Sequence, residues 1–243
     1  RFAARFGFAI DPATGAAARA LGPHLDCVSA ERIQEELLKL LAAPRPGSYL
    51  EPAVLAVVLP ELEPEEQPER FAELCRTIDR IEPTAENVPA RLAALLCPLG
   101  EAGARKALRK LKCSNALTDE VTALERETPG TPNTTLTVQA KRLLGRYELQ
   151  TIQRLTALCS ARHPEQAEAF AALRAEAERL TAENACCRVS QLAVNGRDLM
   201  AAGVRPGPGL RQVLNALLET VITGQTPNEK DALLAAVAQF SAS

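Results

Sequence analysis

The feature that most constrains this 243-residue chain is its helical composition, because Ala and Leu recur throughout and both favour helices. No stretch shows a sustained two-residue alternation of β-branched residues, which is the pattern of a half-buried strand. Pro and Gly recur between the apolar, Ala-rich segments and divide them into short elements. We therefore predict an all-α fold made of many helices.

Capping residues and helix breakers set the expected limits of these helices. Gly7 should end a first helix, Asp11 followed by Pro12 is typical of a helix start, and Ser29 should cap a third helix. Residues 61–69 are acidic and Pro-rich and predict a solvated loop, and residues 128–134 (TPGTPNT) are the clearest linker. Helices are expected near residues 1–6, 12–21, 30–43, 69–81, 87–97, 101–113, 116–127, 136–145, 147–161, 164–184, 197–202, 210–223 and 228–240.

Composition limits the classes of function. The formal net charge is -2, so any nucleic-acid site must be a local basic patch rather than a global field. No apolar run approaches the roughly 20 residues of a membrane span, so we expect no membrane partner. Seven cysteines without a C-x-x-C pair and only two histidines disfavour a metal site and predict reduced thiols in a cytoplasmic protein. Aromatic residues make up only 3%, which disfavours RNA binding by base stacking.

Three blocks of sequence carry more specific patterns. The first combines RFAARFGFAIDP at 1–12 with VSAERIQEELLKLL at 28–41, the second is VLPEL at 58–62, and the third is LAVNGRDLMAAGVRPGPGLRQVLNALLETVITGQTPNEKDALL at 192–234. Their Gly, Pro and charged positions resemble, in register, the C-terminal region of bacterial class II CCA-adding enzymes and poly(A) polymerases. The second block closes a neck helix in that family.

The resemblance implies an elongated all-α arrangement with a neck at 1–62, a body at 63–134 and a tail at 135–243. It also implies that the intact enzyme transfers AMP or CMP from ATP or CTP to the 3′ end of a tRNA or another RNA. An Asp-x-Asp pair in an α/β catalytic head would hold the two Mg ions. Neither Asp-x-Asp nor the base-selecting Glu-Asp-x-x-Arg motif occurs in this sequence. We therefore expect the catalytic head to be absent, no cofactor in this chain and no activity from the chain alone.

Some relatives carry a Leu-Leu-His-Asp-Ile-Gly phosphohydrolase motif in the body. The nearest stretch of this chain is Leu95-Leu96-Cys97-Pro98-Leu99-Gly100, in which Cys and Pro replace the metal-binding pair. The sequence therefore predicts no metal-dependent phosphohydrolase activity.

The segment ARKALRKLKC at 104–113 is the strongest candidate for contact with RNA. It contains five basic residues and no acid: Arg105, Lys106, Arg109, Lys110 and Lys112. On a helix, Arg105, Arg109 and Lys112 would share one face, and Lys106 and Lys110 would share an adjacent face. Such a helix could neutralise several phosphates at once. A merely solvated basic face is the alternative, and the resemblance favours RNA.

A second candidate is RPGPGLRQ at 205–212. Gly207 and Gly209 would let the backbone approach a ligand, and the start of the following helix would offer free N–H groups to an anion flanked by Arg205 and Arg211. A plain Pro/Gly turn that punctuates the helices is an equal and compatible interpretation.

Other residues have mainly structural interpretations. Asn195 and Asp198 should form a turn and helix cap, with Asn195 tolerating a left-handed conformation, while Arg197 is a further candidate for phosphate contact. Phe2 and Phe6 should share one helix face. Ion pairs of Glu31 and Arg32, together with Glu35, should hold the neck helices together.

Two other functional classes remain open: a helical protein-interaction scaffold, which would show contiguous apolar surface instead of a basic stripe, and an independent RNA-binding module. The sequence leaves undecided whether the parent enzyme adds CCA, part of CCA or poly(A), and it does not fix the oligomeric state.

Overall fold

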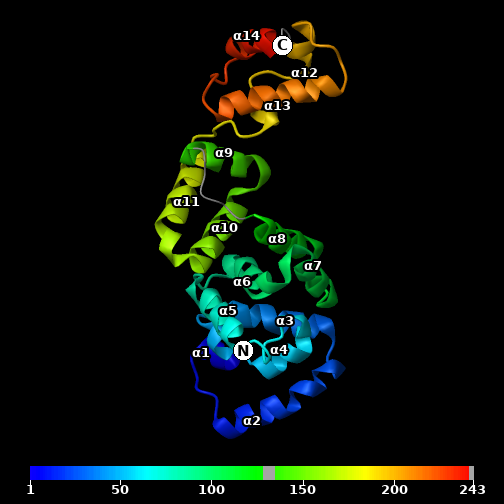
Figure 1. Ribbon diagram of the computed structural model, residues 1–243, viewed down its shortest axis with the longest axis vertical. Coiled ribbons are helices and arrows are strands. Elements are labelled where there is room, and N and C mark those ends of the chain that lie inside the picture. The colour runs from blue at the N-terminus through cyan, green and yellow to red at the C-terminus, as the bar shows by residue number, and fades with distance from the viewer. Residues whose placement is uncertain (128–134, 241–243) are drawn as a thin grey trace. The chain divides into compact units, whose positions relative to one another are not determined.

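The computed structural model describes residues 1–127 and 135–240, and every regular element in these ranges is a helix (Figure 1). The predicted all-α fold is therefore confirmed for the described residues. The predicted linker at 128–134 lies outside them. Within the same ranges, no helix is both long enough and apolar enough to cross a bilayer.

The chain divides into two compact units, which are described separately. Unit 1 takes in described residues 1–127 and 153–170, and unit 2 takes in described residues 135–152 and 171–240. Helices α10 (Leu149–Arg162) and α11 (Ala167–Ala182) each contribute to both units. The division into neck, body and tail stays a prediction.

The helices of unit 1 begin and end close to the predicted limits. Asp11, Ser29 and Ser114 each cap a helix by accepting a hydrogen bond from a backbone N–H of its first turn. Besides its parts of α10 and α11, unit 1 contains α1 (Phe2–Phe6), α2 (Pro12–Leu21), η1 (Gly22–Cys27), α3 (Ala30–Leu41), η2 (Pro46–Tyr49), α4 (Pro52–Val58), η3 (Pro60–Leu62), α5 (Pro68–Arg80), η4 (Ala85–Asn87), α6 (Val88–Leu96), η5 (Cys97–Leu99), α7 (Gly100–Lys110), α8 (Asn115–Arg126) and η6 (Pro164–Gln166).

Helix α6 forms the centre of unit 1. It contacts α3, α5, α7 and α8, and every residue from Pro89 to Leu96 is buried. One of these residues is Arg91, whose guanidinium is fully buried. It donates hydrogen bonds to the carbonyl oxygens of Leu41 and Ala43 at 2.6 Å and to that of Ile81. A single cation thus satisfies the carbonyls at the ends of two helices, α3 and α5, which would otherwise be buried without donors.

Unit 2 is built around a smaller apolar core. Besides the start of α10 and the end of α11, it contains α9 (Leu136–Arg146), η7 (Val189–Gln191), α12 (Gly196–Ala201), α13 (Pro208–Ile222) and α14 (Lys230–Phe240). Its core residues include Val194, Leu199, Leu217, Val221 and Leu233. These side chains come from α12, α13, α14 and the segment before them, so the final third of the chain supplies its own core.

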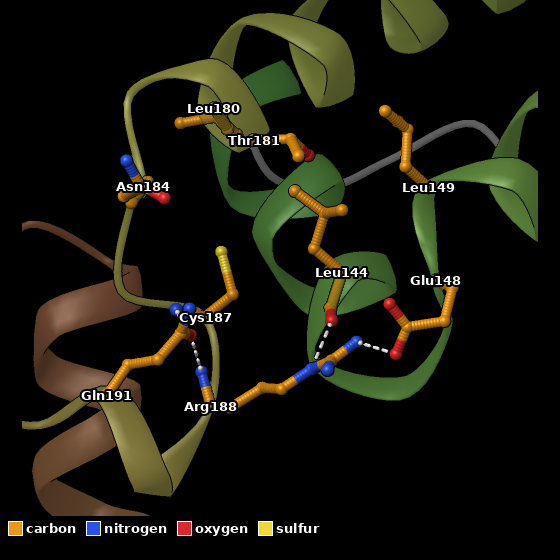
Figure 2. A pocket seen from close by; sticks show the side chains of 10 residues that line it. Leu144, Glu148, Leu149, Leu180, Thr181, Asn184, Cys187, Arg188 and Gln191 are labelled. Carbon is orange, nitrogen blue, oxygen red and sulfur yellow. Dashed lines mark hydrogen bonds and ion pairs between the residues drawn. The ribbon is translucent and has the colours of Figure 1, made fainter.

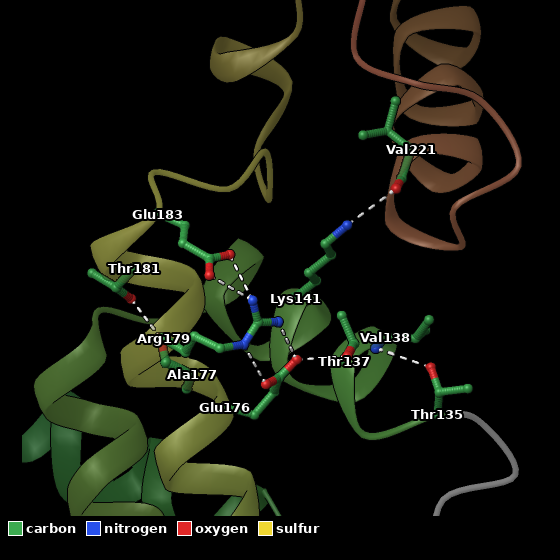
Figure 3. A network of polar contacts seen from close by, with 10 residues as sticks. All are labelled: Thr135, Thr137, Val138, Lys141, Glu176, Ala177, Arg179, Thr181, Glu183 and Val221. Atoms are coloured by element: carbon green, nitrogen blue, oxygen red, sulfur yellow. Dashed lines mark hydrogen bonds and ion pairs between the residues drawn. The ribbon is translucent and has the colours of Figure 1, made fainter.

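Polar contacts connect the elements of unit 2 (Figure 3). On α9, the hydroxyl of Thr137 donates a hydrogen bond to Glu176 on α11 at 2.5 Å, and the ammonium of Lys141 donates to the carbonyl of Val221 on α13 at 3.3 Å. Arg179 on α11 contacts both Glu176 and Glu183. These contacts fix α9 against both α11 and α13.

Candidate nucleic-acid interface

The C-terminal end of α7 presents a group of exposed cations. Lys106, Arg109 and Lys110 lie on the helix, and Lys112 follows its C-cap, Leu111. Within residues 1–127 and 135–240, none of these four side chains forms an ion pair or a hydrogen bond to the protein. We call these four residues the α7 basic end. The helix dipole also favours positive charge at a helix C-terminus, but this favourable interaction does not by itself require four cations.

One detail of the predicted basic stripe is wrong. Lys112 does not continue the face of Arg105 and Arg109, because α7 ends at Lys110 and Lys112 has a left-handed backbone with a φ of 56°. The tight turn is closed by a hydrogen bond from the amide of Cys113 to the carbonyl of Leu108. Lys112 therefore extends the basic group beyond the helix end.

Arg105 differs from the four residues of the α7 basic end. Its guanidinium turns toward α8, where it pairs with Asp119 at 3.0 Å and donates to the hydroxyl of Thr122 at 2.8 Å. Arg105 therefore connects α7 to α8, and its charge is largely matched within the protein.

Several other cations of unit 1 are engaged in the fold. Arg154 pairs with Glu120 and also donates to the carbonyl of Glu86, and Arg162 pairs with Glu125 at 2.6 Å. Burial raises the pKa of the Glu125 carboxyl, while Arg162 acts in the opposite direction. Burial likewise raises the pKa of the nearby Cys159 thiol to about 11. The exposed α7 basic end differs from these cations in lacking acid partners.

In unit 2, the segment at 205–212 forms the predicted turn and helix start. Gly207 has a φ of 137°, a conformation that favours glycine, and Pro208 occupies the first position of α13. Arg205 and Arg211 are exposed and make no ion pair within the described residues. The helix start offers fewer N–H groups than expected, because proline lacks one and the amide of Leu210 donates to the carbonyl of Gly207. A Cβ on Gly209 would meet open space.

The cap before α12 has the predicted role but a different backbone. Asn195 accepts hydrogen bonds from the amides of Arg197 and Asp198, and Asp198 accepts from the amide of Asn195 in return. Asn195 has a φ of -128°, so it does not use the left-handed conformation that asparagine tolerates. Asp198 also pairs with Lys230 on α14, whereas Arg197 is exposed and unpaired within the described ranges.

The predicted ion pairs of the N-terminal helices need correction. Glu31 and Arg32 are exposed and form no ion pair in the described part of the chain, and Glu35 pairs with Lys39 of its own helix. The ion pair that joins α3 to the start of α1 is formed by Glu36 with Arg1. Arg1 and Glu36 are 35 positions apart, so local spacing gave no signal for this contact. Phe2 and Phe6 share one face of α1 as predicted, and both are exposed.

A cavity of about 170 Å³ in unit 2 was not anticipated from the sequence (Figure 2). Beside it, Arg188 donates hydrogen bonds to the carbonyl of Leu144 at 3.0 Å and that of Tyr147 at 3.1 Å, and it pairs with Glu148 at 2.8 Å. Gln191 accepts from the amide of Arg188. These contacts make Arg188 a structural cation that caps the end of α9.

Two family models and several curated proteins match this chain. A family model described as tRNA nucleotidyltransferase domain 2, putative, matches residues 84–237, and one described as the probable RNA and SrmB-binding site of polymerase A matches residues 7–65. The chain is 29% identical over 238 residues to the CCA-adding enzyme of Lactiplantibacillus plantarum, covering 96% of this chain and 56% of that protein. It is 28% identical over 247 residues to the CCA-adding enzyme of Geobacillus stearothermophilus, covering 97% and 57%.

A shorter match has a higher sequence identity. Over 46 residues the chain is 63% identical to the CCA-adding enzyme of Levilactobacillus brevis, covering 19% of this chain and 12% of that protein. The longer matches show that the chain spans a little over half of the length of those curated relatives.

Proposed function

This chain belongs to the tRNA nucleotidyltransferase family, and we propose that it binds the RNA substrate of an enzyme that adds nucleotides to RNA 3′ ends. The observation that carries the proposal is the α7 basic end, with four exposed cations that lack acid partners within the described residues. Such a group can neutralise several phosphates and release their counterions. Contacts of this kind follow the backbone and shape of a folded RNA such as tRNA rather than its base sequence.

Unit 2 supplies a second set of exposed cations to the proposal: Arg197, Arg205 and Arg211. None of them has an ion-pair partner among the described residues, although Asp198 beside Arg197 is paired with Lys230. The turn at Gly207 and Gly209 exposes backbone next to two of these arginines. We assign unit 2 the weaker share of RNA binding, because its cations are fewer and farther apart in sequence than those of the α7 basic end.

In this proposal, a different part of the enzyme catalyses nucleotide transfer. The described residues contain no group of three or more His, Cys, Asp or Glu side chains that could hold a metal ion, so they do not fit a two-metal centre. Two Mg ions and ATP or CTP would instead be bound by a catalytic domain in the part of the relatives that this chain does not span. A cytoplasmic location belongs to the same proposal and is supported by seven cysteines present as free thiols.

Titration of the 243-residue chain with labelled tRNA at low salt, with duplex DNA as competitor, tests the proposal. We expect saturable tRNA binding that duplex DNA of equal charge competes for poorly, because the two helices differ in groove geometry. Incubation with tRNA, Mg²⁺ and labelled ATP should give no extension of the RNA. Absence of tRNA binding at low salt would refute the binding role, and RNA extension by the chain alone would refute the assignment of catalysis elsewhere.

A further inference from the structure

The cavity beside Arg188 in unit 2 has a buried apolar lining and a polar rim (Figure 2). We call it the α11-end cavity. Its volume of about 170 Å³ is below the roughly 300–1,000 Å³ of sites that hold a drug-sized molecule. Leu144, Leu180 and Cys187 line it and are at most 8% exposed. Burial raises the pKa of the Cys187 thiol, so this thiol is neutral. The cavity therefore suits one small ring rather than a whole nucleotide.

Backbone contacts fix the walls of the α11-end cavity. Asn184 follows α11 with a left-handed φ of 52°, and the amide of Ala185 then donates back to a carbonyl of α11 at 2.9 Å. Further along the chain, the side-chain oxygen of Gln191 accepts from the amides of Cys187 and Arg188, both at 2.9 Å. The shape of the cavity is thus preformed, so a ligand would not have to order its walls.

The rim of the cavity offers hydrogen-bonding groups that the fold does not use. The side-chain amide of Asn184 makes no hydrogen bond within the described residues. The side-chain oxygen of Gln191 is engaged, but its amino group has no protein partner in the same ranges. Both residues are exposed. Donors and acceptors above an apolar floor match a nucleobase, which has an apolar face and a polar edge.

A wider groove adjoins the cavity and supplies positive charge. Cys187 and Arg188 line both spaces, and Arg142 and Arg146 of α9 line the groove. Both arginines of α9 are exposed. Among the described residues, the charged side chains that line the groove are these three arginines and one acid, Glu219, which pairs with Arg142. The groove is therefore net positive where it meets the cavity.

We infer that the α11-end cavity receives one unpaired base of the bound RNA and that the adjoining groove receives the phosphate next to that base; this inference rests on the proposed function. Folded RNA presents such bases in its loops, where they splay out and are recognised at their edges. A snug pocket with apolar walls compensates a base for the stacking that it loses. Unit 2 would then recognise one nucleotide of the RNA, whereas the α7 basic end contacts phosphates alone.

Chemical probing of tRNA bound to the 243-residue chain tests the inference. Dimethyl sulfate and a carbodiimide modify the pairing edges of unpaired bases, and a base inside the cavity should be protected from them. In the test variant, Ala185→Leu places a larger apolar side chain in the cavity, which Ala185 lines. The matched control is Ala182→Leu, because Ala182 is exposed at the end of α11 and does not line the cavity.

We expect the wild-type chain and Ala182→Leu to protect an unpaired base of the tRNA. At saturating concentrations of Ala185→Leu, the same base should react as it does in free tRNA. The affinity of Ala185→Leu for tRNA should fall about fivefold, since the contact with one base is lost. The salt slope should stay unchanged, because no phosphate contact is removed. Unchanged protection in Ala185→Leu would overturn the inference, as would tRNA binding by the wild-type chain that protects no unpaired base.

A second variant keeps the test available if thermal unfolding shows that Ala185→Leu is not folded. Asn184→Gly suits the left-handed backbone and removes the unused amide, so it should partly restore reactivity of the protected base. Full protection in Asn184→Gly would then overturn the inference. Equilibrium dialysis with labelled AMP and UMP separates the two sources of a base, and tight binding of either free nucleotide would overturn the RNA assignment. Absence of tRNA binding would refute the proposed function as well.

Discussion

The α7 basic end and helix α11 both carry cations, but they differ in the acids around them. On α11, Arg179 contacts Glu176 at 2.7 Å and Glu183 at 2.6 Å, and Arg174 pairs with Glu178 at 3.0 Å. On α7, the cations from Lys106 onward have no acid three or four residues away. Because acids at that spacing neutralise cations on the same helix, these cations of α7 remain available to an external anion and those of α11 do not.

The comparison teaches that cations of this chain fall into two classes that composition alone cannot separate. Engaged cations, such as Arg179 and the buried Arg91, stabilise the fold. Available cations, such as those of the α7 basic end, are exposed without an ion-pair partner among the described residues, and the proposed function assigns them to RNA. Substitutions in the first class should lower the free energy of unfolding, and substitutions in the second should lower RNA affinity.

The largest expected effect concerns the most deeply engaged cation. Arg91→Ala removes the donors for three buried carbonyl oxygens and leaves a cavity at the centre of unit 1. We expect the free energy of unfolding to fall by about 4 kcal/mol. Chemical denaturation monitored by circular dichroism measures it, with Arg109→Ala as the control that removes an exposed cation. A loss as small as that of the control would show that burial does not distinguish the two classes.

Next in size is the effect of removing the α7 basic end. Changing Lys106, Arg109, Lys110 and Lys112 together to Ala should lower tRNA affinity at low salt by tenfold or more, roughly, because several phosphate contacts are lost. The unfolding midpoint should hardly change, since exposed substitutions usually alter stability by less than about 0.5 kcal/mol. Affinity is measured by filter binding and stability by thermal unfolding. A large loss of stability together with normal tRNA binding would show that these four cations stabilise the fold and do not bind RNA.

A smaller effect on stability is expected from pH at α11. Hydrogen bonds from Arg179 and then Thr137 lower the pKa of the Glu176 carboxyl from 4.5 to about 2. A carboxyl whose pKa is lower in the folded state contributes stability that is present above about pH 4.5 and is lost as pH falls toward 2. Glu176→Gln should therefore flatten the acid side of the stability profile, whereas the exposed control Glu168→Gln should not. Identical acid profiles for the two variants would contradict this.

The smallest effect should come from converting one engaged cation into an available one. Asp119→Asn removes the carboxylate that pairs with Arg105 at 3.0 Å, next to the α7 basic end. We expect tRNA affinity at low salt to rise about two- to threefold, as a surface ion pair is worth at most about 1 kcal/mol. The exposed control Asp231→Asn should give a smaller increase. Lower affinity in Asp119→Asn would mean that the pair orders α7 for binding.

Local patterns in the sequence predicted most of the fold. The caps at Asp11, Ser29 and Asn195 and the break at Gly7 lie where short-range spacing placed them. Contacts between distant segments were not predictable in this way. Asp119 is 14 positions from Arg105, and Arg91 reaches a carbonyl 50 positions away. Whether a cation is engaged therefore depends on tertiary neighbours that periodicity does not reveal.

The candidate site shows the same limit. The lack of acids between Lys106 and Lys112 is a local property, and it identified the basic segment from the sequence. The end of α7 at Lys110 and the left-handed conformation of Lys112 depend on the turn into α8, so the predicted shared face was wrong.

The most direct test of the central claim is the salt dependence of tRNA binding in three proteins. These are the wild-type chain, the variant lacking the α7 basic end, and a control with Arg174→Ala and Arg179→Ala, which removes engaged cations. Each phosphate contact on a duplex contributes about 0.9 to the slope of log affinity against log salt. The slope should become shallower by up to about 3.6 in the α7 variant, which loses four cations, and stay near the wild-type value in the control. Equal slopes in all three proteins, or equal flattening in both variants, would contradict the assignment of the α7 basic end as the RNA-binding site.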